Sequence, residues 1–373
     1  MKIINLDAAA GGANPSSIHS SGVAAAAKLA EARESVASDL GAHADEIIFT
    51  SGGTEANNLA ILGVAKAIKS SKKNHIITLA TEHASVLEPC RALERWGFDV
   101  TYLDVKPDGL IDLTEFKKAL RPETVLVSVS YVNNEIGVLQ PIREISKIIR
   151  RHVEHSVSDR GDAECLLHTD ACQAPQFLNL NVAQLGIDLM TLNGSKLDAA
   201  KGVGCLYVKR GVVLEPIIYG GGQERGLRSG TENVPAITIF AKSLSVATKK
   251  SEKESARLTK LRDYFIKKLL KFDGVTLNGS ATARIANNVN VSFKNADSEY
   301  IVLSLDAKGV LASSGSACST QTKDSSYVIQ ALGGGANRAS SAVRFSLTPK
   351  TSKHDLDYVL KILPEILTRA LAK

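Results

Sequence analysis

The stretch from residue 165 to residue 208, CLLHTDACQAPQFLNLNVAQLGIDLMTLNGSKLDAAKGVGCLYV, contains three short apolar runs separated by polar turns. The runs at 165–171, 188–192 and 203–208 have the length of buried β-strands. The first run carries Asp170 near its end, and Lys196 closely follows the second. A carboxylate that ends an apolar strand is costly unless it has a partner. In open α/β sheets ligands bind at the carboxyl ends of the strands, so we expect a site here.

The alternation continues toward the N-terminus, where apolar runs are again followed by amphipathic segments of helical period. Further strands are expected at 46–50, 75–80, 99–105 and 124–130, with a short additional one at 3–6. Helices are expected at 23–40, 55–70, 84–96, 113–120 and 142–151. Strands that alternate with helices predict an α/β domain with a mostly parallel, seven-stranded sheet covered on both faces.

The pattern changes after about Val234. A long helical region at 236–271 precedes strand candidates at 289–293 and 301–305, a segment rich in glycine and serine, a strand at 342–347 and a final helix from about residue 353. This order is typical of a smaller α+β domain. We therefore expect a large domain at 1–233 and a smaller domain at 234–373.

The composition excludes several classes of protein. The 373 residues are 44% hydrophobic and 23% charged, which are ordinary globular values, and no apolar run approaches the length of a membrane span. The first residues do not resemble a signal peptide, so a cytoplasmic protein is expected. The net charge of +6 is scattered along the chain and only 5% of the residues are aromatic, which disfavours a nucleic-acid groove. A mild positive field still favours an anionic cofactor.

The chain has five cysteines, at positions 90, 165, 172, 205 and 318. The odd number and the absence of CxxC spacing disfavour a disulfide framework and a zinc site, so no metal is expected. In a reducing compartment these are free thiols. Cys318 differs from the others because it follows the small, polar run SSGSA at 313–317.

Polar turns follow several of the expected strands. The turn TSGGTE at 50–55 carries Gly53 and Thr54 at the start of a helix, where free N–H groups can bind a phosphate, although glycine turns of this kind are often only structural. His83 and Asn134 lie in similar positions and, taken singly, are also explained as surface or turn residues. Together, a phosphate cradle, an aspartate and a lysine amine are the groups that pyridoxal 5′-phosphate (PLP) requires.

The order of these motifs resembles that of the cysteine desulfurases of the iron–sulfur-cluster and nitrogen-fixation type, which are class-V aminotransferases. The resemblance runs over nearly the whole chain and rests on EIIFTSGGTEANNLAI, TEHASVL, VNNEIGVLQPI, HTDACQA, NGSK, GGGQERGLRSGTENV, SSGSACS and VRFSL. It implies the fold-type I architecture of PLP-dependent transferases, the cofactor PLP and a homodimer.

The resemblance also implies roles for individual residues. Lys196 is implied to hold PLP covalently, Asp170 to pair with its ring nitrogen, and His83 to stack on the ring and to assist proton transfer. The remaining residues are implied to bind the cofactor (Gly53, Thr54, Gln173, Ser195 and, from the partner subunit, Thr231) or the substrate carboxylate (Asn134 and Arg344). The last role suits arginine, whose guanidinium binds a carboxylate through two hydrogen bonds.

Cys318 is implied to be the nucleophile that takes sulfur from L-cysteine, leaving L-alanine and an enzyme persulfide. The small residues around it suit a loop that carries sulfur to an acceptor protein, such as a cluster scaffold, or toward tRNA thiolation.

Some positions depart from the family pattern. Ser195 stands where a histidine is usual, and Asp198-Ala199-Ala200 replaces a segment that usually contains glycine and proline. Two alternatives therefore stay open at this point: a selenocysteine lyase or another PLP-dependent lyase or aminotransferase, and a weakly active paralogue that serves as a scaffold.

Overall fold

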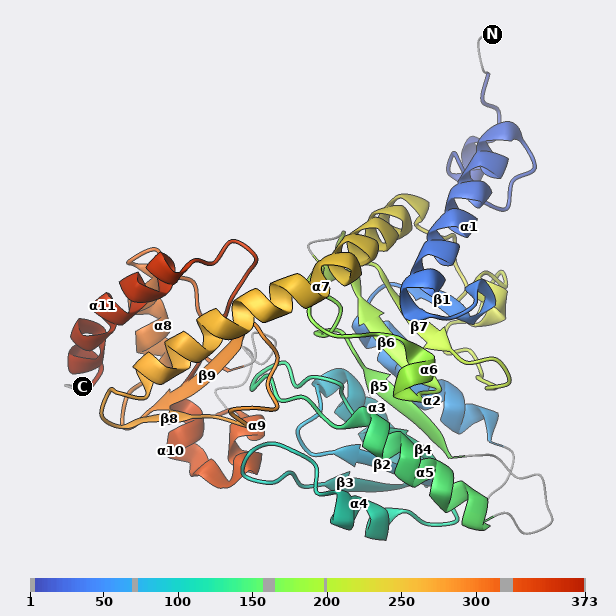
Figure 1. Ribbon diagram of the computed structural model, residues 1–373. Helices are drawn as coiled ribbons and strands as arrows, with labels where there is room; N and C mark the ends of the chain where they lie inside the picture. The colour runs from blue at the N-terminus through green and yellow to red at the C-terminus, as the bar shows by residue number, and fades with distance from the viewer. Residues whose placement is uncertain (1–3, 69–72, 157–164, 198–199, 316–324, 372–373) are drawn as a thin grey trace.

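A computed structural model describes residues 4–68, 73–156, 165–197, 200–315 and 325–371. Its largest feature is a seven-stranded sheet, here called the large sheet, with the strand order β1-β7-β6-β5-β4-β2-β3 (Figure 1). Strand β7 runs antiparallel to both of its neighbours, and every other pair is parallel. The strands are β1 (Ile47–Thr50), β2 (His75–Leu79), β3 (Asp99–Leu103), β4 (Thr124–Ser128), β5 (Leu166–Asp170), β6 (Leu189–Asn193) and β7 (Gly204–Val208). The predicted mostly parallel sheet is confirmed.

Helices cover both faces of the large sheet because its strands are apolar on both sides. One face, represented by Ile48, Ile76 and Leu126, packs against α2 (Gly53–Ala67) and α3 (Ala84–Arg95). The side chains that alternate with these point to the other face and form a second core with α1 (Ser20–Leu40), α5 (Ile142–Ser156) and α7 (Val234–Leu269). Two short helices, α4 (Leu113–Ala119) and α6 (Val182–Leu185), complete this part of the chain.

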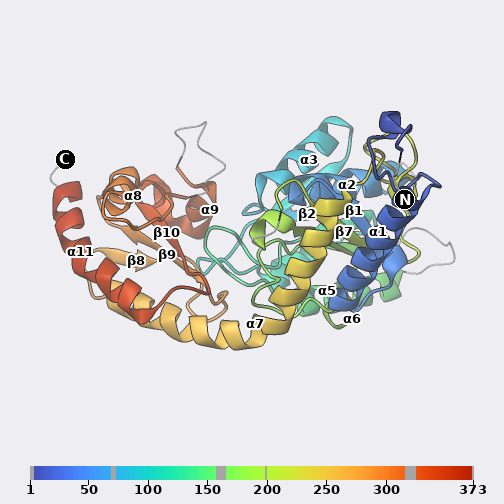
Figure 2. The same cartoon turned by 90° about the horizontal axis from the view of Figure 1, so that it is seen from above.

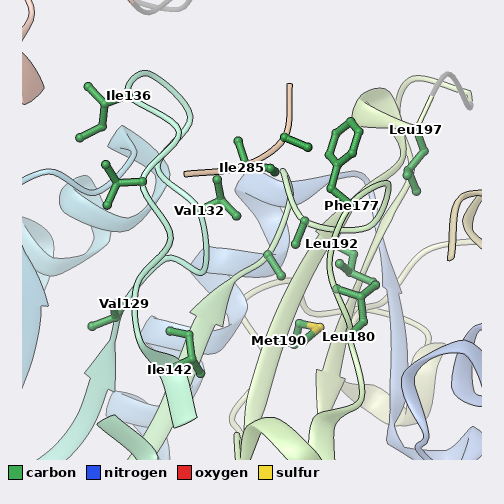
Figure 3. Close-up of a cluster of buried hydrophobic side chains, with 14 of the residues drawn as sticks. Val129, Val132, Ile136, Ile142, Phe177, Leu180, Met190, Leu192, Leu197 and Ile285 are labelled. Carbon is green, nitrogen blue, oxygen red and sulfur yellow. The ribbon is translucent and has the colours of Figure 1, made fainter. Parts of the chain in front are cut away.

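Figure 3 shows part of the second core, close to the carboxyl ends of the strands. Val129 follows β4, Met190 and Leu192 belong to β6, and Leu197 directly follows Lys196. The edge of the sheet at which the site is expected therefore lies on a packed apolar layer.

A second, antiparallel sheet, here called the small sheet, has the order β10-β9-β8. Its strands are β8 (Val275–Leu277), β9 (Asn288–Phe293) and β10 (Ala342–Ser346). It packs with the C-terminal half of α7 and with α8 (Ser298–Asp306), α10 (Gly335–Ser340) and α11 (Lys353–Leu371), while α9 (Tyr327–Ile329) lies toward the large sheet. Seen from above in Figure 2, α7 runs from beside α1 to the small sheet. The boundary between residues 233 and 234 stays a prediction.

Two predicted strands are wrong. Residues 301–305 lie within helix α8, where Ile301 and Leu305 are buried one turn apart while Leu303 is 68% exposed. The side chain of Asp297 caps this helix by accepting the N–H groups of Glu299 and Tyr300, so a helix-start signal outweighs the apolar run. Residues 4–6 are not a strand, because no described segment pairs with them and an unpaired strand is not stable. Among the described residues, no helix has the length and apolar character to cross a bilayer.

Candidate active site

The carboxyl ends of β1, β2, β4, β5 and β6 meet at one edge of the large sheet and face β10 of the small sheet. A cavity of about 300 Å³ lies between them. It is lined by polar residues from both sheets: Gly53, Thr54, His83, Ser85, Ser130, Asn134, Asp170, Cys172, Gln173, Asn193, Lys196, Asn287, Arg344 and Ser346, together with Val132.

Asp170 is the last residue of β5, and its carboxylate has two close donors. Asn57 Nδ2 donates to Oδ2 at 2.7 Å, and the backbone N–H of Cys172 donates to Oδ1 at 2.9 Å. Asn57 comes from α2 and is fully buried. The expected partners of this aspartate are therefore a side-chain amide and a backbone N–H rather than a cation.

His83 is connected to Asp170 by a chain of hydrogen bonds. It is the N-cap of α3, and its Nδ1 accepts the N–H of Ser85 at 3.1 Å and lies 2.8 Å from Ser85 Oγ. Asn57 Nδ2, which binds Asp170, also donates to Ser85 Oγ at 2.8 Å. The chain fixes the imidazole and the carboxylate relative to each other, because Ser85 and Asn57 connect them through hydrogen bonds.

The turn before α2 brings its backbone close to the chain at the carboxyl ends of β5 and β6. Gly52 has a φ of 149°, and a Cβ on Gly53 would lie 2.8 Å from Cys172 Sγ and 3.3 Å from Asn193 Cβ. Glycine is thus required for close packing at Gly53 and for the backbone conformation at Gly52. The first turn of this 15-residue helix presents N–H groups that have no partner within the helix, which makes it suitable for an anion.

Lys196 ends a single turn of 3-10 helix that follows β6. Asn193 begins this turn, and its side chain accepts the N–H of Ser195 at 3.2 Å. Gln176 Nε2 donates to the carbonyl of Lys196 at 2.8 Å. The backbone of Lys196 is thereby fixed, while its amine stays accessible from the cavity that Asp170 and Gln173 also line.

Arg344 supplies the opposite wall from β10. Its Nη1 donates to the carbonyl of Asn134 at 3.0 Å, which connects the small sheet to the edge of the large one. A guanidinium in this cavity provides a positive charge for a small carboxylate.

Two buried ionisable groups lie next to the cavity, and the sequence pointed to neither. Burial raises the pKa of Glu82 to about 8, and its Oε1 accepts the N–H of Ser130 at 2.8 Å. Burial lowers the pKa of His168 to about 4, and its ring nitrogens lie within hydrogen-bond distance of Ser128 Oγ and Thr191 Oγ1. Both groups are therefore neutral at pH 7, which keeps unpaired charge away from the base of the site.

Most of the site residues predicted from the sequence lie together. Eight line the cavity: Gly53, Thr54, His83, Asn134, Asp170, Gln173, Lys196 and Arg344. Ser195 and Thr231 are exposed and are not among its lining residues, and Cys318 lies outside the described residues. Asn57 was not predicted from the sequence. An asparagine on the buried face of an amphipathic helix needs a polar partner, and this is the signal that could have identified it.

The family model described as aminotransferase class-V matches residues 8–359. A cysteine desulfurase, IscS, of Dictyoglomus turgidum is 44% identical over 95% of this chain and 88% of its own length. The chain belongs to the class-V aminotransferase family, among its cysteine desulfurases.

Solved structures of related proteins have the same fold as this class-V protein. A NifS-like protein has a TM-score of 0.86 at 32% identity, covering 95% of this chain and 92% of its own. A structure described as SspA in complex with cysteine has a TM-score of 0.76 at 35% identity, covering 91% of this chain and 92% of its own.

Proposed function

We propose that this protein is a cysteine desulfurase that uses PLP to remove sulfur from L-cysteine, giving L-alanine and a persulfide on Cys318. The observation that carries the proposal is the grouping of Lys196, Asp170, His83 and Arg344 around one small cavity. The relatives named cysteine desulfurase, which match nearly the full chain, support the same reaction.

The residues present fit PLP. The cavity brings together a lysine amine, a carboxylate held by two donors, an imidazole and the N-terminal turn of helix α2 with Gly53 and Thr54. Their chemistry matches the aldehyde, the ring nitrogen, the ring face and the phosphate of that cofactor. When bound, PLP supplies an electron sink that weakens the bonds around the α-carbon of an amino acid.

The side chains of this protein bind and orient the cofactor. Lys196 would hold it covalently and move protons at its own Nζ, while Asp170, kept in place by Asn57, would pair with the ring nitrogen. Gly53, Thr54 and Ser195 would bind the phosphate, with Thr231 supplied by the partner subunit of a homodimer. Gln173 would donate to the ring hydroxyl, and His83 would stack on the ring.

The substrate is bound through its carboxylate by Arg344 and Asn134, which places its sulfur in the cavity. The Cys318 thiolate attacks that sulfur, so that a sulfur–sulfur bond forms and the bond from sulfur to the substrate β-carbon breaks. The electron pair of the broken bond stays with the carbon, which takes up a proton to become the methyl group of L-alanine. The persulfide then passes to an acceptor, for iron–sulfur cluster assembly or tRNA thiolation.

One assay tests the proposal. Purified protein with PLP and L-cysteine is scored for alanine and, by mass spectrometry, for a persulfide on Cys318. A Cys318→Ala variant is expected to give neither product, and Cys90→Ala, which changes a buried thiol of α3, is expected to give both. If PLP binds but the wild-type protein forms no alanine, the proposed substrate is wrong. Transamination without sulfide would instead favour an aminotransferase.

A further inference from the structure

Two hydrogen bonds tie the residues after position 324 to the edge of the large sheet. Ser326 Oγ donates to Glu135 Oε2 at 2.6 Å, and Tyr327 Oη donates to the backbone carbonyl of Glu82 at 2.5 Å. Both bonds join segments that lie far apart in the sequence. They are made by the second and third described residues that follow Cys318 along the chain.

The two acceptors are held firmly and lie next to site residues. Glu82 directly precedes His83, its side chain is buried, and its Oε1 accepts the N–H of Ser130. Glu135 directly follows Asn134 and is also buried. The carbonyl of Glu135 accepts hydrogen bonds at 3.0 Å from two asparagines of β9, Asn288 and Asn290. Tyr327 and Ser326 are therefore attached to fixed points beside the cavity.

The described residues before Cys318 are attached at the same place. Ser313 exchanges two backbone hydrogen bonds with Arg344, at 3.1 and 2.7 Å, and Arg344 binds the carbonyl of Asn134. The chain thus leaves the site beside Arg344 and returns to it beside Glu82 and Glu135. The described residues on both sides of Cys318 are therefore attached at the edge of the cavity.

We propose that Tyr327 and Ser326 are positioning residues for the sulfur-transfer step, because they fix the point at which the chain carrying Cys318 returns to the cavity. This inference rests on the proposed function. Neither side chain is among the lining residues of the cavity, so neither is expected to contribute to binding L-cysteine. Releasing one attachment lengthens the chain between the attached residues on either side of Cys318, which lowers the effective concentration of its thiol at the substrate sulfur.

The expected effect is a selective loss of rate. A hydrogen bond contributes on the order of 1 kcal/mol, and about 1.4 kcal/mol is tenfold, so each of Tyr327→Phe and Ser326→Ala should slow persulfide formation on Cys318 about fivefold, and the double variant about thirtyfold. The apparent Kd of L-cysteine, measured by the absorbance change of the PLP-loaded protein, should stay within about twofold of the wild type. A slower rate of persulfide formation with an unchanged Kd of L-cysteine therefore separates positioning of the thiol from substrate binding.

Two matched controls are available in the small-sheet part of the chain. Tyr358 is 42% exposed, against 40% for Tyr327, and its hydroxyl also donates to a backbone carbonyl, that of Lys308 at 3.1 Å. Ser340 Oγ donates to the carbonyl of Asn337 at 3.2 Å. Tyr358→Phe and Ser340→Ala each remove a hydroxyl hydrogen bond that does not reach the large sheet, so persulfide formation should proceed at the wild-type rate in both.

The experiment is a single-turnover reaction of the full-length, PLP-loaded protein at saturating L-cysteine, with persulfide quantified by mass spectrometry. A transfer rate in Tyr327→Phe and Ser326→Ala equal to that of the controls overturns the inference while leaving the proposed function intact. A changed affinity for L-cysteine also overturns it, since the bonds would then act through His83 or Asn134. If Tyr327→Phe does not fold, as judged by circular dichroism, Ser326→Ala alone decides. A wild-type protein that forms no alanine refutes the proposed function, and this inference with it.

Discussion

Replacing Glu82 by glutamine should change how the stability of the protein depends on pH. The Glu82 side chain is 1% exposed, its Oε1 accepts the N–H of Ser130, and its Oε2 is buried without a hydrogen-bond partner. Burial raises its pKa from 4.5 to about 8, with a smaller contribution from the negative charge of Asp170. Glutamine has nearly the same shape as the neutral acid but does not titrate.

The sign and size of the effect follow from linkage. Because the folded pKa is the higher one, Glu82 contributes stability that is fully present below pH 4.5 and is lost as the pH rises toward 8. Each pKa unit corresponds to about 1.4 kcal/mol, so the free energy of unfolding of the wild type should fall by about 3 kcal/mol relative to Glu82→Gln between pH 5 and pH 8. His168 has the opposite trend, since its lowered pKa favours the folded state as the pH rises above 4. That contribution is common to both proteins and cancels in the difference.

The assay is urea unfolding of both proteins at pH 5, 6, 7 and 8, at one fixed PLP concentration. Glu34→Gln, which changes an exposed glutamate of α1, is the control and should keep a constant difference from the wild type. A difference between wild type and Glu82→Gln that does not vary with pH would show that Glu82 is ionised in the folded protein. The reasoning from its burial would then be wrong.

Further changes test other parts of the structure. Arg33→Ala should lower the free energy of unfolding by about 3–5 kcal/mol in urea, because Arg33 Nη1 and Nη2 both bind the Glu224 carboxylate, whose side chain is 1% exposed. Gly53→Ala should weaken PLP binding about tenfold in an absorbance titration, which corresponds to about 1.4 kcal/mol, because the added Cβ contacts Cys172 Sγ. Cys172 should stay unlabelled by iodoacetamide at pH 8 until the protein is unfolded, because burial raises the pKa of its thiol well above the ordinary value. Arg344→Lys should raise the KM for L-cysteine at least about tenfold, since lysine cannot form the two parallel hydrogen bonds of a guanidinium.

Much of the large sheet could be predicted because its strands are continuous apolar runs that end at a polar residue. The predicted strands at 124–130 and 165–171 extend one or two residues beyond the ends of the observed β4 (Thr124–Ser128) and β5 (Leu166–Asp170). Parallel strands bring such endings to one edge, so local patterns also indicated which residues would meet. This is why eight of the predicted site residues line one cavity.

The parts that sequence reasoning missed depend on contacts between distant segments. Asn57 and Ser85 are ordinary polar residues of two helices until the fold places them between His83 and Asp170. Glu82 has an unusual pKa only because it is buried, which no local pattern reveals. The apolar run at 301–305 predicts a strand where the structure has helix α8, because the run has too few apolar residues to distinguish a helical period from a strand period.

The continuous helix α7 couples the folding of the two sheets, because each sheet packs against one half of it. Its first turns bury Ile237, Phe240 and Leu244 in the core of the large sheet, and its last turns bury Phe265 and Leu269 in the core of the small one. Cleavage of the chain before Val234 would leave the C-terminal fragment with an uncovered apolar helix face and the N-terminal fragment with an open core. Although the strands divide cleanly into two sheets, each half is expected to aggregate when produced alone, and both should be recovered in soluble form when co-expressed.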